Sequence, residues 1–174
     1  MTAPTPHPLV QLARAAVEAM VREHRALTAA EAPVPIEMEP AGAFVTIHTA
    51  KGELRGCIGT IEPTQGELAD EVIQNAISAA TRDPRFPPVR PDELPGLVID
   101  VSLLYPPEPI ESPDQLDPRR YGVIVQRGGR RGLLLPDLPG IDDATTQVAY
   151  ARQKASIGPD EPVKLFRFRV DKYT

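Results

Sequence analysis

The residues of this sequence best suited to chemistry lie in segment 54–61, where the only cysteine, Cys57, follows Arg55 by two positions. In a β-strand alternate side chains lie on the same face, so Arg55, Cys57 and Gly59 would share one face. The Cα atoms of Arg55 and Cys57 would then be about 7 Å apart, twice the strand rise, and a guanidinium at that range could favour the thiolate form of the cysteine. Because the thiolate is the nucleophilic form, this spacing predicts a site at Arg55 and Cys57, without specifying a reaction.

The segment before this strand brings a histidine into the predicted site. It alternates like a second strand, and a tight two-residue loop at Lys51-Gly52 would join the two strands as a β-hairpin. With that loop, His48 lies opposite Arg55 and Thr46 lies opposite Cys57. His48 could then activate Cys57 as a general base if the two side chains meet within hydrogen-bond reach.

The other face of the predicted hairpin is apolar throughout. Alternate side chains of a strand lie on the same face, and those on this face are all aliphatic. We expect it to pack in the core of the protein. Its members are Val45, Ile47, Leu54 and Ile58.

Cys57 has three interpretations from sequence: a catalytic nucleophile, a residue that lines a pocket, or a small buried hydrophobe of the core. The neighbouring Gly56 and Gly59 mark either a bulge or close helix crossing, or a place where a ligand approaches the backbone. In the functional interpretation, Gly56, Gly59 and Thr60 contact the bound ligand.

Arg55 needs a partner if it is buried among apolar strand residues. Asp83, Asp100 or a ligand could supply it. The loop that contains Asp83, Arg85 and Phe86 ends the second predicted helix at Asp83-Pro84, because proline disfavours helix in the residue before it. This loop either plugs the helix end onto the sheet or forms one wall of a cleft, with Asp83, Arg85 and Phe86 as binding residues.

The composition is that of an ordinary globular protein. The 174 residues are 41% hydrophobic and 25% charged, which suffices for one substantial core or for two small lobes that share one. The sequence has neither an apolar run of membrane-spanning length nor a signal-peptide pattern. A single cysteine excludes an internal disulfide framework. We therefore expect a cytoplasmic protein that does not contact the membrane.

Several functional classes are disfavoured by the same sequence. The net charge of −5 argues against general nucleic-acid binding, which relies on neutralising phosphates. His7, His24 and His48 are scattered, without the paired spacing of a metal site. The sequence has no dinucleotide fingerprint, phosphate-binding glycine loop or serine-nucleophile elbow. We expect no bound metal and no cofactor.

Hydrophobic periodicity predicts three helices and six strands. Thr64 and Glu67 match a capping box at the start of the second helix, and Asp142 or Asp143 is expected to cap the third. Because βαβ alternation is not regular, the predicted fold class is α+β, with a largely antiparallel sheet flanked by helices. The predicted helices span residues 8–24, 64–82 and 142–158, and the predicted strands span 44–49, 54–61, 97–105, 122–126, 132–136 and 163–170.

Arginines gather around the predicted hairpin of residues 122–136. Such a cluster in an acidic protein is either a solvated hairpin tip or a surface for an acidic partner or a phosphate. We expect the first. The cluster comprises Arg119, Arg120, Arg127, Arg130 and Arg131.

Taken together, several stretches resemble the AMMECR domain family, whose prokaryotic members are named AmmeMemoRadiSam system protein A. The resemblance implies an α+β fold with two interleaved lobes in a single domain over residues 9–174, after a flexible lead-in at 1–8. It implies no securely established activity, although links to nucleotide or RNA modification have been proposed for the family. The stretches are Leu54–Thr60, Asp83–Pro88, Val101–Leu104, Tyr121–Val123, Gly132–Pro136 and Gln147–Lys154.

Two functional hypotheses follow. In the first, the protein is an enzyme or enzyme-complex component with a cleft around Arg55 and Cys57, and the family name implies Memo-like and radical SAM partner proteins. In the second, it is a non-catalytic adaptor that binds a small molecule or a partner protein through the same surface. Nucleic-acid binding through the arginine-rich hairpin ranks last.

Overall fold

The structure is a computed structural model that describes residues 2–174. The chain divides into two compact units. Unit 1 comprises the residues up to Leu104 together with Asp171–Thr174, and unit 2 comprises Tyr105–Val170. Each unit contains a four-stranded antiparallel sheet. The α+β class with antiparallel sheets, predicted from the sequence, is therefore confirmed.

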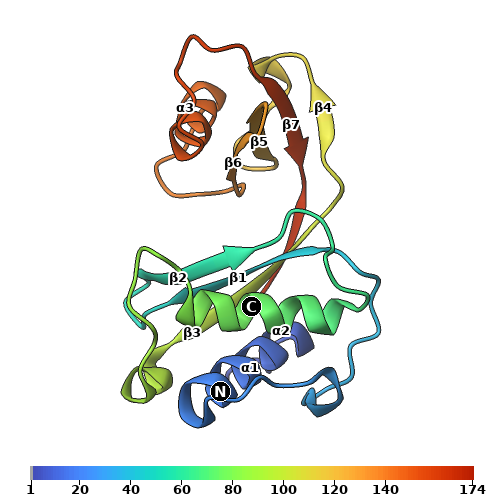
Figure 1. The fold of residues 1–174 in the computed structure, drawn as a ribbon, viewed down its shortest axis with the longest axis vertical. Coiled ribbons are helices and arrows are strands. Elements are labelled where there is room, and N and C mark those ends of the chain that lie inside the picture. The colour runs from blue at the N-terminus through green and yellow to red at the C-terminus, as the bar shows by residue number, and fades with distance from the viewer. Residues whose placement is uncertain (1) are drawn as a thin grey trace. The chain divides into compact units, whose positions relative to one another are not determined.

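The sheet of unit 1 has the strand order β2-β1-β3-β8, and two helices cover one of its faces (Figure 1). We call the opposite face of this sheet the outer face. The predicted central position of the third strand is confirmed, because β3 lies inside the sheet. The elements are α1 (Pro8–Glu23), β1 (Gly42–His48), β2 (Leu54–Gly59), α2 (Leu68–Thr81), β3 (Val98–Leu104) and β8 (Val170–Tyr173), with short 3-10 turns η1 (Ala29–Glu31) and η2 (Pro91–Gly96).

The sheet of unit 2 has the strand order β4-β7-β5-β6, and α3 packs against β5 and β6. Among residues 2–174 the structure has three helices, as predicted, and eight strands rather than six. The two strands missed from sequence, β4 and β8, are only three and four residues long, too short for a periodic pattern. The elements are β4 (Glu108–Ile110), η3 (Pro113–Gln115), β5 (Gly122–Arg127), β6 (Arg130–Leu134), α3 (Ala144–Lys154) and β7 (Lys164–Phe168).

Helix α1 shows how the apolar pattern builds the core of unit 1. Pro8 occupies its first turn, where the missing N–H costs nothing, and the His7 Nδ1 atom accepts a hydrogen bond from the Leu9 amide at 3.2 Å. Leu9, Ala13 and Ala16 are fully buried against the rest of the core. The helix ends where His24 adopts the left-handed conformation, with φ of 53°.

The hairpin of β1 and β2 differs in register from the prediction. Its loop has three residues rather than two, because the Thr49 amide donates to the Glu53 carbonyl at 2.8 Å. Gly52 closes the loop with φ of +84°, a conformation that glycine adopts without strain. A bulge follows, so that His48 lies opposite Leu54. The predicted pairing of His48 with Arg55 is therefore wrong.

The same bulge changes which residues of β2 reach the core. Beyond it, Thr46 lies opposite Cys57, as predicted. Val45 and Ile47 are fully buried, and Ile58 packs against the core. Leu54 was predicted in the core but is 37% exposed, since the bulge turns it to the outer face with its partner His48.

Helix α2 begins at Leu68, and the predicted capping box at Thr64 and Glu67 is not formed. Thr64 instead donates from its hydroxyl to the Glu71 carboxylate at 2.6 Å. Glu71 is buried and also accepts a hydrogen bond from the Thr60 hydroxyl at 3.1 Å. These hydrogen bonds hold the loop after β2 against the side of α2, so the loop does not form the first turn of the helix.

Of the two residues predicted to cap the third helix, Asp142 and Asp143, the structure has Asp143. Its side chain accepts a hydrogen bond from the Thr146 amide at 2.7 Å.

The two units repeat one arrangement of elements. In each, a hairpin is followed by a helix and then by a strand that pairs with the first strand of the hairpin: β1-β2-α2-β3 and β5-β6-α3-β7. A glycine on the second hairpin strand lets the helix backbone approach in both: Gly56 meets the Ala79 carbonyl, and Gly132 meets the Ala151 carbonyl. The repeated arrangement provides an internal comparison for the features of unit 1.

Candidate functional site

Cys57 lies on β2, the edge strand of the sheet of unit 1, and is half-buried. Its Sγ atom is 3.3 Å from the Thr46 hydroxyl on the neighbouring strand. Its backbone N–H donates to Asp83 Oδ2 at 3.0 Å, and its carbonyl accepts from Arg85 Nη2 at 3.3 Å. Asp83 and Arg85 therefore satisfy the outward backbone groups of the edge strand at Cys57, as a further strand would.

Asp83 and Arg85 form a bidentate ion pair. The Nε and Nη2 atoms of Arg85 donate to the two carboxylate oxygens of Asp83 at 3.0 and 2.8 Å. Asp83 is 4% exposed. The hydrogen bond from Arg85 holds the pKa of Asp83 well below its usual value, although burial acts in the opposite direction, and the Cys57 amide adds to the lowering. The Asp83 carboxylate raises the pKa of Arg85 in turn.

Arg55 is bound by Glu93, which the sequence did not single out. The Nη2 atom of Arg55 lies 3.0 Å from Glu93 Oε2 and 3.3 Å from the Pro88 carbonyl. Only 11% of the Arg55 side chain is exposed. Burial acts to raise the pKa of Glu93, but hydrogen bonds from the Arg90 amide and the Arg55 guanidinium lower it below its usual value. The sequence suggested Asp83, Asp100 or a ligand as the partner of Arg55. Among the described residues the partner is Glu93.

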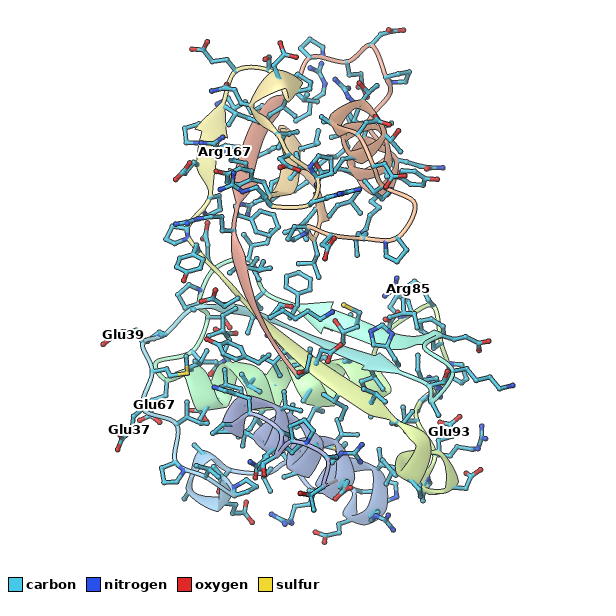
Figure 2. The ribbon with its side chains drawn as sticks, turned by 180° about the vertical axis from the view of Figure 1, so that it is seen from behind. Glu37, Glu39, Glu67, Arg85, Glu93 and Arg167 are labelled. Carbon is cyan, nitrogen blue, oxygen red and sulfur yellow. The ribbon has the colours of Figure 1, made fainter. Side chains whose placement is uncertain are left out.

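Phe86 links the two arginines. The guanidinium carbons of Arg55 and Arg85 lie 5.9 and 5.5 Å from the centre of its ring, within the range of cation–π contacts. Figure 2 labels Arg85, in the loop between α2 and η2, and Glu93, in η2. The stretches 54–60 and 83–88, far apart in sequence, thus meet along β2.

His48 lies on the outer face and turns to a different partner. Its Nε2 atom is 3.7 Å from Asp100 Oδ2 on β3, and the Lys172 ammonium on β8 is 3.8 Å from the same oxygen. The Nδ1 atom of His48 is buried and has no hydrogen-bond partner among residues 2–174. The Cys57 thiol thus has a hydroxyl as a neighbour, whereas Arg55 and His48 each have a carboxylate.

The remaining predicted binding residues have structural contacts. Gly56 packs on the Ala79 carbonyl of α2, and Gly59 packs under the Phe44 ring. The Thr60 hydroxyl donates to Glu71 and accepts from the Asn75 amide. Each residue has a role in packing, and its contact with a ligand stays a prediction.

Unit 2 shows which features belong to the shared architecture. Leu133 follows Gly132 on β6, as Cys57 follows Gly56 on β2. The Leu133 carbonyl accepts a hydrogen bond from the Lys154 ammonium at 2.9 Å. A cationic side chain on this carbonyl is therefore common to both units, whereas the thiol and the buried Asp83 are features of unit 1.

The arginine-rich hairpin of unit 2 is tied to its own chain. Arg127 and Arg130 lie 3.4 and 2.8 Å from Glu161 Oε1. The hydrogen bond from Arg130 lowers the pKa of Glu161 to about 2. Arg167, labelled in Figure 2, stacks over the Tyr121 ring at 4.4 Å. Two arginines of this hairpin thus share one carboxylate within the unit.

Two further features concern the classes of function. Unit 2 has a shallow, mainly apolar hollow of about 440 Å³ between α3 and Pro113, Ile157 and Pro159, which the sequence did not indicate. Among residues 2–174, no group of three or more His, Cys, Asp or Glu side chains is arranged to hold a metal ion. None of the helices in this part of the chain is both long and apolar enough to cross a membrane.

Comparison with known proteins assigns the family. The AMMECR1 family model matches residues 10–173, and the chain belongs to this family. A Thermotoga maritima protein is 50% identical over 170 residues, covering 96% of this chain and 97% of its own. The crystal structure of an uncharacterised Pyrococcus horikoshii protein matches with a TM-score of 0.86 at 36% identity, over 94% of this chain and 88% of that one.

One relative contains the same module within a longer chain. A Clostridium acetobutylicum protein is 39% identical over 168 residues, which cover 95% of this chain but only 36% of that protein. In that organism the module is therefore covalently joined to a larger polypeptide.

Proposed function

We propose that this protein is a non-catalytic adaptor module that binds a partner protein through the outer face of unit 1. The observation that carries the proposal is that two of the three candidate catalytic side chains, Arg55 and His48, each face a carboxylate. Arg55 is neutralised by Glu93 at 3.0 Å, and His48 faces Asp100 rather than pairing with Arg55. A base that activates a cysteine nucleophile lies within hydrogen-bond reach of it, and the Cys57 Sγ atom lies 3.3 Å from the Thr46 hydroxyl, which is not a base.

The exposed side chains of the outer face support a binding role. Leu54 and Val98 are 37% and 51% exposed and lie on either side of His48 across three strands. Exposed aliphatic side chains grouped on one face in this way are typical of surfaces that contact other proteins. The longer Clostridium relative supports a protein as the partner, since the module there is attached to another polypeptide. The Memo-like and radical SAM proteins suggested by the family name are the partners that we propose to test.

The proposal predicts opposite effects for two substitutions. Val98→Glu would place a charge in the contact surface and weaken binding of the partner at least tenfold, a loss of about 1.4 kcal/mol or more. Cys57→Ser would leave binding intact, because a serine hydroxyl can keep the contact that the thiol makes with the Thr46 hydroxyl. Isothermal titration calorimetry of the full chain with the Memo-like and radical SAM proteins of the same organism measures both effects.

Tyr150→Glu is the matched control, because Tyr150 is 50% exposed on α3 in unit 2. It should bind as the unchanged protein does. The opposite result would be a Cys57→Ser protein that has lost its function and a Val98→Glu protein that binds normally. It would reject the adaptor proposal in favour of an enzyme that uses Cys57.

A further inference from the structure

Two rows of side chains cross the outer face of unit 1. Antiparallel pairing places the residues of each row side by side on neighbouring strands. One row is polar, and the next has a histidine between two exposed aliphatic side chains. The polar row is Cys57, Thr46 and Asp100, and the second row is Leu54, His48 and Val98.

The carboxylate of Asp100 lies in the polar row and is held by two long ion pairs. Asp100 is only 8% exposed. Its Oδ2 atom lies 3.7 Å from His48 Nε2 and 3.8 Å from Lys172 Nζ, and both distances exceed that of a direct hydrogen bond. A buried carboxylate is costly unless donors surround it, so this one has capacity for a further donor.

Lys172 shows that an ammonium can reach Asp100 from the solvent side. Its side chain is 61% exposed and comes from β8, the edge strand next to β3. At 3.8 Å, with most of the side chain in water, the pair is a loose one of little stabilising value. A second ammonium with direct hydrogen-bond geometry would compete with Lys172 for the same oxygen.

Val98 supplies an apolar surface beside this carboxylate. It is 51% exposed and lies two residues before Asp100 on the same face of β3. A long aliphatic stem that carries a cationic head can lie along such a surface while its head reaches a polar group. A lysine side chain combines this stem with an ammonium donor.

The repeated arrangement in unit 2 shows that the fold does not demand this combination. The pair Val125 and Gly132 in unit 2 corresponds to the pair Ile47 and Gly56 in unit 1. The row next to that pair is then Arg131, Gln126 and Lys164, which is polar and charged. The position of Asp100 is taken by Phe166. The carboxylate with its aliphatic neighbours is thus particular to unit 1.

We infer that the outer face of unit 1 binds a lysine side chain of the partner protein, with its ammonium on Asp100 and its stem on Val98. This inference rests on the proposed adaptor function, for which it names the recognised group. Complementarity of charge supports it: the site offers a carboxylate whose ion pairs with His48 and Lys172 are both long. The bound lysine displaces Lys172 into solvent.

Titration of the full chain with Nα-acetyl-lysine-N-methylamide, followed by the methyl NMR signals of Val98, tests this site. Saturable shifts are expected, and the norleucine analogue, which lacks the ammonium, should give none at the same concentration. Asp100→Asn should weaken binding at least tenfold. Lys172→Gln, at an exposed position that folding tolerates, should strengthen binding severalfold because a competing ammonium is removed.

Equal shifts with the norleucine analogue, or affinity unchanged in both Asp100→Asn and Lys172→Gln, would overturn the lysine site. These outcomes are independent of the adaptor proposal, since a partner could still bind and lose affinity with Val98→Glu. Conversely, failure of every partner to bind would reject the adaptor while the NMR titration still reports on Asp100.

Discussion

At the scale of single residues, Asp83 joins the two stretches of unit 1 that meet at β2. Its carboxylate accepts hydrogen bonds from the Cys57 amide, the Arg85 amide and the Arg85 guanidinium. Because the residue is 4% exposed, replacing its carboxylate by an amide would leave one of its two acceptor oxygens missing beside these donors. Asp83 therefore fixes the position of Cys57 whether or not the thiol has a chemical role.

We predict that Asp83→Asn lowers the free energy of unfolding by about 2 kcal/mol at pH 7, the scale of hydrogen bonds to a charged group. The pKa of Asp83 is lowered in the folded state, so its stabilising effect is present above the unfolded pKa of about 4 and is lost as the pH falls below it. Urea unfolding at pH 7 and pH 3 should show a difference between variant and unchanged protein that shrinks at pH 3.

Asp92→Asn is the control for this pH effect, because the Asp92 side chain is 73% exposed in a surface pair with Arg90. Its unfolding midpoint should match that of the unchanged protein at both pH values. An Asp83→Asn deficit that persists undiminished at pH 3 would show that shape rather than charge makes Asp83 important.

The sequence predicts part of this residue network. Thr46 lies beside Cys57 as predicted, because the bulge after the loop offsets the additional loop residue and restores the predicted register. The partner of Arg55 could not be predicted, because Glu93 lies 38 residues away and reaches it only through the course of the 83–90 loop. The one contact of Glu93 that depends on neighbouring residues is the hydrogen bond that its carboxylate accepts from the Arg90 amide, which is typical of a short 3-10 turn.

At the scale of elements, the contact between β2 and α2 depends on a missing side chain. Gly56 faces the Ala79 carbonyl so closely that a Cβ atom would overlap it. The helix backbone must therefore move, or the strand must shift, to admit any larger residue. This contact explains why a glycine precedes Cys57 without reference to a ligand.

Gly56→Ala should accordingly lower the free energy of unfolding by about 2 kcal/mol, as overpacking in a well-packed core does. Gly66→Ala provides the comparison, since a Cβ at Gly66 meets no atom within 4 Å. Thermal unfolding followed by circular dichroism would give both values. A Gly56→Ala protein as stable as Gly66→Ala would mean that α2 does not press on β2 as the structure describes.

The hairpin illustrates where prediction of elements ends. Both strands were predicted by alternation, yet one additional loop residue moved His48 away from Arg55. The glycine at position 52 was visible in the sequence, but both two-residue and three-residue loops use a glycine there. Only the pairing of Thr49 with Glu53 distinguishes them.

At the scale of the whole molecule, chain order and sheet membership do not coincide. The strand that follows β3 in sequence, β4, pairs with β7 in the sheet of unit 2, and the strand that follows β7, β8, joins β3 in the sheet of unit 1. The C-terminal residues also reach α1, because the Tyr173 and His7 rings lie 4.1 Å apart. Unit 1 therefore requires the last residues of the chain.

We predict that deleting residues 170–174 destabilises unit 1 selectively. The backbone hydrogen bonds between β3 and β8 would be lost, and β3 would become an edge strand. Hydrogen–deuterium exchange should then accelerate in β3 and α1, while β5 and β7 keep their protection. Deleting residues 2–5, which are exposed, should leave both sheets protected. Uniform loss of protection in both units would show that they unfold as one.

The sequence by itself determined the features that depend on neighbouring residues: the helices, the hairpins, their apolar faces and the membership of the AMMECR1 family. Local periodicity carries these because each side chain's face follows from the residues beside it. The tertiary structure decided the ion pair of Arg55, the turn of His48 toward Asp100 and the placement of β4 and β8. These depend on loop course and on pairing between distant strands, which no local pattern encodes.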